Sequence, residues 1–139
     1  MNTQTNPARD VRIRVVVADD HPVVPGMVRS ALQRHPHFEV CGEAENGAEA
    51  IEEVKRVRPD VVVLNVTMPV VNGFQAAREI KKQIPETAIV ILSSHADKYF
   101  VAEAKKVGVR AYVPKSKIGQ ALVQALEAAV KGDDFIVLE

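Results

Sequence analysis

The chain has few of the residues that mark specialised protein classes. Of its 139 residues one is a cysteine, none is a tryptophan and only 4% are aromatic. Cys41 therefore has no partner for an internal disulfide, and we expect a reducing cytoplasm as the setting of this protein. Cys41 lies in the alternating stretch FEVCGEA, where we interpret it as a small buried side chain without a function of its own.

A charge of one sign and a long apolar run are also missing. Eighteen Lys and Arg balance eighteen Asp and Glu, so no overall basic field attracts nucleic acid or an anionic membrane. The apolar runs have the length of strands, and the opening residues, MNTQTNPARD, lack the apolar region of a signal peptide. We therefore expect no membrane association, and any contact with DNA has to come from another domain.

What the sequence does contain is a regular alternation of short β-branched runs and longer helical patterns. We predict strands at 13–19, 38–44, 61–65, 88–94 and 110–113, and helices at 22–35, 47–58, 73–83, 97–107 and 117–131. Near-continuous Val, Ile and Leu in the first, third and fourth strands indicates burial on both faces. The expected fold class is α/β, with one domain built on a five-stranded, doubly wound parallel sheet.

Local signals refine the helix predictions. Pro22 suits a first helical turn, whereas Pro25 would follow that turn and distort the helix. Asp97 and Ser116 are expected to cap the fourth and fifth helices. Apolar residues at every fourth position of the last helix form one stripe, which we interpret as core: Ile118, Leu122, Leu126 and Val130.

Polar side chains end or closely follow four of the five predicted strands. In an open parallel sheet such groups meet beyond the carboxyl ends of the strands. They are Asp19, Asp20, Asn65, Ser93, Ser94 and Lys115. The adjacent acids have two interpretations, a Mg²⁺ site or solvated residues that cap the first helix. Their placement beside the other strand-end residues favours a shared site.

The histidines do not add a second site. A zinc site needs His or Cys ligands at characteristic spacings. The four histidines, which lack such a spacing and a cysteine partner, are His21, His35, His37 and His95. We interpret them as solvated or capping residues.

Several spaced motifs together resemble one family, the receiver domain of two-component response regulators. They are VVVADDHPVV, GEAENGAEAIE, RPDVVVLNVTMPVVNGFQAAREI, ILSSH and GVRAYVPKS. The resemblance runs from about Arg12 to Gly132, and it is strongest to the subgroup that precedes a LuxR-type helix-turn-helix output domain. It implies a flavodoxin-like receiver fold over residues 12–132, a disordered segment at 1–11, and a C-terminal tail or linker at 133–139.

The resemblance also implies what the domain does. It would be a cytoplasmic signalling module of transcription regulation and not an enzyme. Its partners would be a sensor histidine kinase and a second copy of the chain, with DNA bound only by an output domain outside this chain. The chain stops at GDDFIVLE, where a linker to such a domain would begin, and its final LE has the form of a cloning remnant.

Carried over to this sequence, the resemblance places Mg²⁺ on Asp19, Asp20 and the backbone carbonyl of Thr67. Asn65 falls where the family has its phosphoacceptor aspartate. A receiver works because a carboxylate attacks the phosphorus of a phosphohistidine, and a neutral amide with a delocalised nitrogen lone pair is a very poor nucleophile. We therefore expect phosphotransfer to residue 65 to be lost. Mg²⁺ binding should be weak because one anionic ligand is missing.

The same resemblance assigns the remaining site residues. Ser93 matches the switch hydroxyl, Tyr112 the switch aromatic, and Lys115 the ammonium that pairs with the phosphoryl group. Tyr112 is either a switch that swings between buried and exposed rotamers or an ordinary edge-strand tyrosine. The flanking helices are expected to offer a docking face for a second copy or a partner helix, with Tyr99, Phe100, Leu122 and Leu126.

Two explanations of Asn65 remain open. The chain is either a natural receiver that works without phosphorylation or an engineered form frozen in the unphosphorylated state. Two further departures from the common pattern favour the natural form. One is Pro25. The other is Ser116, which follows Lys115 at a position where many receivers have a proline.

Two other functions are compatible with the same kind of sheet. The alternative to a receiver is a Mg²⁺-dependent phosphatase of the haloacid-dehalogenase type, which has DxDxT after the first strand where this chain has ADDHP. A flavodoxin would need a Ser/Thr-rich phosphate loop after that strand. The strand-end residues favour the signalling module over both enzymes and flavin carriers.

Overall fold

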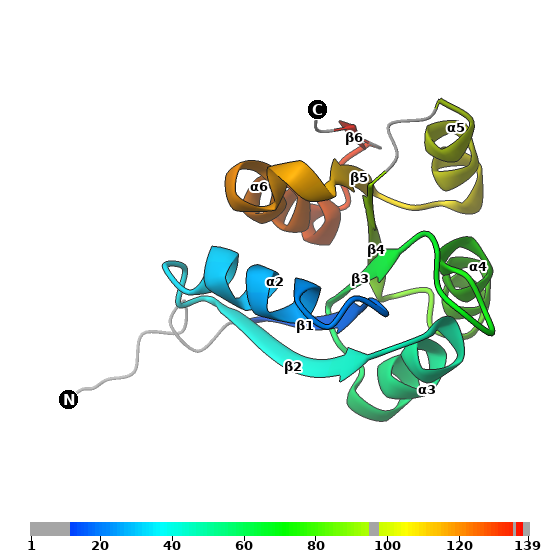
Figure 1. Ribbon diagram of the computed structural model, residues 1–139, viewed down its shortest axis with the longest axis horizontal. Helices are drawn as coiled ribbons and strands as arrows, with labels where there is room; N and C mark the ends of the chain where they lie inside the picture. Colours follow the sequence, from blue (N-terminus) through cyan, green and yellow to red (C-terminus); the bar gives the residue numbers. More distant parts are fainter. Residues whose placement is uncertain (1–11, 95–97, 135, 138–139) are drawn as a thin grey trace.

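The protein folds around one parallel sheet with the strand order β2-β1-β3-β4-β5-β6. The computed structural model describes residues 12–94, 98–134 and 136–137 (Figure 1). Its strands are β1 (Ile13–Ala18), β2 (Phe38–Ala44), β3 (Val61–Asn65), β4 (Ala88–Ser93), β5 (Ala111–Pro114) and β6 (Ile136–Val137). The predicted α/β class and parallel sheet are confirmed, and the five predicted strands begin and end within one residue of the observed bounds.

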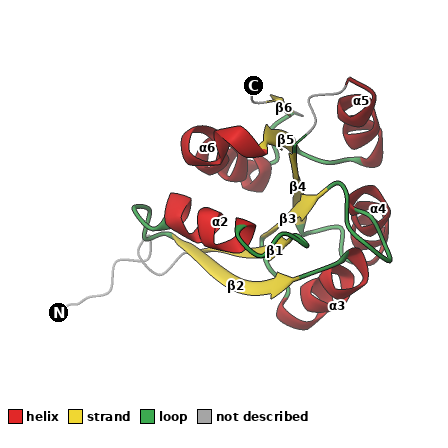
Figure 2. Cartoon of the chain, in the orientation of Figure 1, coloured by secondary structure: helices red, strands yellow, loops and turns green. Residues whose placement is uncertain are grey.

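Helices cover both faces of the sheet (Figures 1 and 2). They are α2 (Val24–Leu32), α3 (Gly47–Val57), α4 (Gly73–Gln83), α5 (Lys98–Val107) and α6 (Ile118–Lys131). The pair α2 and α6 packs on one face, and α3, α4 and α5 pack on the other. Each face has its own hydrophobic cluster, which is the doubly wound arrangement that the alternation of elements predicts.

Local sequence explains the two helices that flank the end of β3. The Asn46 side chain accepts a hydrogen bond from the Glu49 backbone N–H at the start of α3. Asn72 and Gln75 form a reciprocal capping box at the start of α4. Between these helices, all five residues of β3 are buried, because both faces of this central strand are covered.

The C-terminal segment differs from the expected tail. Ile136 and Val137 form a short strand that pairs in parallel with β5. Tyr112 therefore does not lie on an edge strand in the described sheet, which corrects one of its two interpretations. The predicted disordered segment, 1–11, lies outside the described residues.

Three local predictions are wrong, those for Pro22, Pro25 and Ser116. The first helix begins at Val24, so Pro22 precedes the helix instead of lying in its first turn. Pro25 lies inside that first turn, where a missing N–H loses no helical bond, so the expected distortion has no cause there. Ser116 caps nothing, because a 3₁₀ turn occupies Lys115–Lys117 before α6 begins.

The apolar stripe of the last helix is also different at its end. Ile118, Leu122 and Leu126 are buried as predicted. Ala129 completes the buried face, and Val130 is exposed. Asp97, the other predicted cap, lies outside the described residues. None of the described helices has the length and apolar character needed to cross a bilayer.

Candidate functional site

The candidate site lies where the strand order reverses, between the carboxyl ends of β1 and β3. Open α/β sheets place their functional groups at such a crevice. Asp19 and Asp20 follow β1, and Asn65 is the last residue of β3. Lys115 follows β5, so side chains from distant parts of the chain meet at this edge of the sheet.

Asp19 is the buried charge of the site, with only 3% of its surface exposed. One carboxylate oxygen, Oδ1, accepts a hydrogen bond of 2.8 Å from the His21 backbone N–H. The other, Oδ2, accepts no hydrogen bond of regular geometry, but the Lys115 ammonium lies 2.9 Å away. A buried carboxylate is costly unless its charge is compensated, so Lys115 is the group that makes the burial of Asp19 tolerable.

Asn65 is likewise buried, at 5% exposure, and its amide nitrogen faces oxygens only. Nδ2 lies 2.7 Å from the backbone carbonyl oxygen of Thr67. It lies 3.2 Å from Oδ1 of Asp20 and 3.4 Å from Oδ1 of Asp19. The short distance to the Thr67 carbonyl is that of a good hydrogen bond. The two longer distances are those of one N–H shared between the two carboxylates.

These oxygens are chemically suited to a magnesium ion. Carboxylates and backbone carbonyls are the ligands that this hard cation prefers. Asp19, Asp20 and Thr67 contribute one such oxygen each, and all of them already point at the Asn65 nitrogen. The donor set therefore fits the ion, whereas the space between the donors is filled by the amide.

Asp20 and His21 form the outer side of the site. Asp20 is exposed, and the His21 imidazole is also mostly exposed. Ligand atoms of Asp19, Asp20 and His21 all lie within 4.8 Å of one another. The His21 Nδ1 atom is 3.9 Å from Asp19, too far for a hydrogen bond, which agrees with the interpretation of His21 as a solvated residue.

The segment from Val66 to Gly73 follows β3 and supplies the Thr67 carbonyl to the site, and two of its features were not predicted. A Cβ on Gly73 would lie 2.1 Å from the Asn65 carbonyl oxygen, so α4 can approach β3 only because residue 73 is glycine. Val70 has a φ of 69° and lies at the centre of a turn in which the Val71 N–H donates to the Pro69 carbonyl. This is the strained, left-handed class of γ-turn, and a β-branched residue rarely adopts it.

The sequence predicts neither the close approach at Gly73 nor the positive φ at Val70. The VNG stretch is a turn signal, but a turn signal does not say which backbone atom comes close to the glycine. The strain at Val70 has no sequence signal, because valine is the type of residue that the left-handed region disfavours.

The two predicted switch residues lie on the neighbouring strands β4 and β5. Ser93 ends β4, and the strand register places it next to Pro114, directly before Lys115. Tyr112 is in β5 and, at 1% exposure, it is the largest fully buried side chain. In this structure the Tyr112 ring is therefore part of the core.

The predicted docking face is largely wrong. Leu122 and Leu126 are fully buried against the sheet, because they belong to the apolar stripe of α6. Phe100 is partly buried, and its ring packs edge-on against Phe74 at a centroid distance of 5.9 Å. Of the four residues, Tyr99 alone is well exposed.

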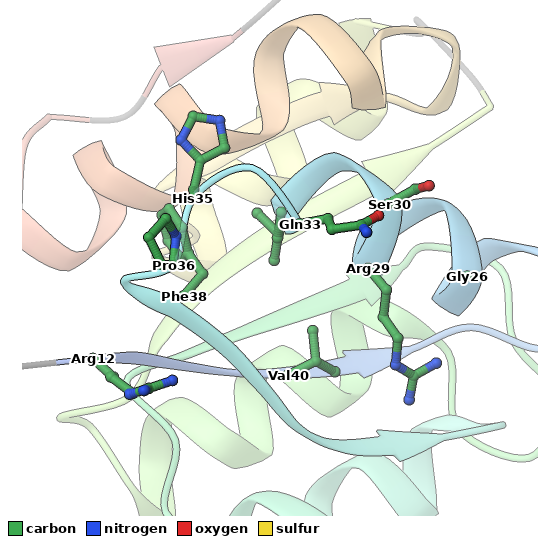
Figure 3. Close-up of a pocket in the computed structure, with 10 residues that line it drawn as sticks. Arg12, Gly26, Arg29, Ser30, Gln33, His35, Pro36, Phe38 and Val40 are labelled. Atoms are coloured by element: carbon green, nitrogen blue, oxygen red, sulfur yellow. The ribbon is translucent and has the colours of Figure 1, made fainter.

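A separate cavity of about 710 Å³ lies beside α2 and β2, and none of the strand-end residues lines it. Its walls come from α2, the loop that follows α2, and β2, together with Arg12 (Figure 3). Arg29 on its rim forms an ion pair with Glu43. The cavity is open and shows no set of converging reactive groups, so the strand-end site is the stronger candidate.

Cys41 lies in surroundings that disfavour a reactive thiol. It is partly buried in β2, and burial raises the pKa of its thiol, with Glu39 and Glu53 adding to the effect of burial while Arg14 opposes it. A thiol with a raised pKa forms less of the nucleophilic thiolate near neutral pH. The interpretation as a structural residue agrees with this environment.

Comparison with known proteins gives one consistent result. The family model of the response regulator receiver domain matches residues 15–127. The chain is 33% identical over 136 residues to the transcriptional regulatory protein DegU of Brevibacillus brevis, covering 98% of this chain and 56% of that protein. It is 35% identical over 118 residues to the chemotaxis protein CheY of Thermotoga maritima, covering 85% of this chain and 98% of that protein.

Solved structures agree with this. The crystal structure of a LuxR-family two-component response regulator from Aurantimonas superimposes with a TM-score of 0.84 at 32% identity, covering 91% of this chain and 89% of that one. The chain spans about half the length of the first curated relatives that it matches.

Proposed function

The chain belongs to the family of response regulator receiver domains, and on that basis we propose that it is the receiver module of a two-component regulator that has lost its phosphoryl response. Receiver domains are signalling modules rather than enzymes. The chain matches only 56% and 58% of the lengths of two regulators of transcription among its relatives, which supports an output domain outside this chain as the part that acts on DNA. We place the receiver at residues 12–132, with 133–139 as the start of a linker.

One observation carries the proposed loss of phosphotransfer. The side chain at the end of β3, facing both acidic residues and the Thr67 carbonyl, is an amide that donates hydrogen bonds. A phosphoacceptor has to present a lone pair on a carboxylate oxygen to phosphorus. Asn65 instead presents N–H groups to the carboxylates around it, and its nitrogen lone pair is delocalised.

The other residues retain their roles in this proposal. Asp19, Asp20 and the Thr67 carbonyl form a weak Mg²⁺ site, and Lys115 holds the place of the ammonium that pairs with a phosphoryl group. Ser93 and Tyr112 are the elements that would move if the site were charged. A sensor histidine kinase and a second copy of this chain are the proposed partners in the cytoplasm.

Beryllofluoride tests whether this is a receiver whose response depends on residue 65. This mimic of a phosphoryl group completes its coordination with a carboxylate oxygen. ¹⁵N–¹H spectra of the wild type and of Asn65→Asp are recorded at constant Mg²⁺, before and after beryllofluoride is added. We expect resonances at Ser93, Tyr112 and Lys115 to shift in Asn65→Asp only. Shifts of the same residues in the wild type, or none in Asn65→Asp, would contradict the proposal.

A further inference from the structure

We infer that the side-chain amide of Asn65 occupies the place of the divalent cation in this pocket and acts as a stand-in for it inside the chain. The inference rests on the proposed placement of the cation site at Asp19, Asp20 and the Thr67 carbonyl. It goes beyond the loss of a nucleophile and a ligand. It assigns Asn65 a stabilising role, in which the amide N–H groups bind the oxygens of the acidic pocket when no metal is bound.

The contacts of one atom support this assignment. A magnesium ion in this pocket would need to draw oxygens from Asp19, Asp20 and Thr67 toward one point. The Asn65 Nδ2 atom already lies at such a point, at 3.4, 3.2 and 2.7 Å from those oxygens. The distances are those of N–H hydrogen bonds rather than of metal coordination, as expected for a larger and more weakly charged donor.

The orientation of the amide follows from the same surroundings. If the amide were turned by half a rotation, its carbonyl oxygen would face two carboxylates and a backbone carbonyl, and of these acceptors only Asp19 Oδ1 would keep a donor, the His21 backbone N–H. The orientation with nitrogen inward is the one that gives these acceptors a donor. The two N–H groups therefore serve the three oxygens, with the Thr67 carbonyl at the shortest distance.

The negative charges of Asp19 and Asp20 explain why the pocket needs a hydrogen-bond donor or a cation. Asp19 and Asp20 are adjacent acids, and Lys115 pairs with the far oxygen of Asp19. The near oxygens of both acids still face each other across the pocket, and a cation or a polar donor between them reduces their repulsion. A cation that entered would have to displace the amide and break its hydrogen bonds to both charged groups. Competition from Asn65 would therefore weaken Mg²⁺ binding beyond the effect of charge.

Asn65→Ala separates competition from ligand number. Alanine has the same charge as asparagine but offers neither a donor nor an oxygen. If Asn65 were only a poor ligand, Asn65→Ala would bind Mg²⁺ as weakly as the wild type or more weakly. If the amide competes with the ion, Asn65→Ala binds more tightly, by about tenfold for the loss of one hydrogen bond to a charged group.

The measurement is a calorimetric Mg²⁺ titration of the wild type, Asn65→Ala and Asn65→Asp. Adding Asp20→Asn to Asn65→Ala is the matched control, and it should remove the gain, because Asp20 is exposed and can be exchanged without disturbing the core. The expected order of affinity is Asn65→Asp, then Asn65→Ala, then the wild type.

The outcomes separate this inference from the proposed function. If Asn65→Asp binds more tightly than the wild type but Asn65→Ala does not, the cation site is correctly placed and the stand-in role of the amide is wrong. If Asn65→Asp does not gain affinity, the placement of the site fails, and the inference fails with it.

A second measurement needs no variant and covers the case in which Asn65→Ala does not fold. In ¹⁵N–¹H spectra of the wild type, the two side-chain N–H protons of Asn65 should exchange with water more slowly than those of the exposed Asn72. They should lose this protection as Mg²⁺ is raised. Exchange at the rate of Asn72 in the absence of Mg²⁺ would overturn the inference.

Discussion

The Nζ atom of Lys115 lies 2.9 Å from Oδ2 of Asp19, and their side chains are only 15% and 1% exposed. Lys115 follows β5, and Asp19 follows β1, so this ion pair joins the two outer strand ends of the site across β3 and β4. A buried ion pair is held in place by the cost of leaving one charge alone.

Lys115→Ala is therefore expected to destabilise the fold. It leaves the Asp19 carboxylate buried without compensation, which costs about 3 kcal/mol of unfolding free energy. Lys105→Ala, at an exposed position on α5, is the control and should change the free energy by less than about 0.5 kcal/mol. Urea denaturation of both variants checks this, and equal stabilities would show that the ion pair contributes nothing.

Gly73 and Gly119 should respond in opposite ways to alanine. A Cβ on Gly73 would meet the Asn65 carbonyl oxygen at 2.1 Å, whereas a Cβ on Gly119 in α6 would meet nothing within 4 Å. Gly73→Ala should lower the unfolding free energy by about 2 kcal/mol through backbone displacement. Gly119→Ala should raise it by about 0.5 kcal/mol through helix propensity. Thermal or urea unfolding decides, and a stable Gly73→Ala would refute the close approach.

Val70 is a second position where a single substitution should stabilise the protein. Its side chain is 81% exposed, so Val70→Gly loses little packing, and glycine removes the strain of the positive φ. We expect a gain of about 1 kcal/mol in unfolding free energy. Val23→Gly is the control, because Val23 is exposed with an ordinary φ of −79° and should only lose stability. A loss in both variants would argue against strain at Val70.

Tyr112 is expected to behave as a core residue. Tyr112→Ala removes a fully buried ring and should cost about 4 kcal/mol of unfolding free energy. Tyr99→Ala is the matched control on the exposed surface of α5, and it should leave stability nearly unchanged while it tests self-association. Melting temperature and sedimentation velocity of both variants are the readouts. A Tyr112→Ala variant that changes self-association without a lower melting temperature would restore the mobile switch.

The sheet and its helices were predictable because short strand-like runs, most of them rich in β-branched residues, alternate with longer helical patterns. β3 is the clearest case, since VVVLN is buried throughout and ends at Asn65. The buried face at the end of α6 was not predictable. Which of Ala129 and Val130 is buried depends on the direction in which the helix turns each residue, and not on which of them is more hydrophobic. The 3₁₀ turn at Lys115–Lys117 was also missed, as its short repeat leaves no periodic pattern.

The members of the candidate site were predictable for a similar reason. Strand ends of a parallel sheet meet at one edge, so Asp19, Asn65 and Lys115 could be grouped from the sequence alone. What each side chain does there could not be predicted. The direction of the Asn65 amide depends on where three oxygens from different loops come to lie, and these positions follow from packing.

Acetyl phosphate tests whether residue 65 accepts a phosphoryl group. Wild type and Asn65→Asp are incubated with acetyl phosphate and Mg²⁺, and their intact masses are compared. We expect Asn65→Asp to gain one phosphoryl group and the wild type to gain none, because the amide cannot serve as the carboxylate nucleophile. A phosphoryl adduct on the wild type that maps to Asn65 would contradict the loss of phosphotransfer.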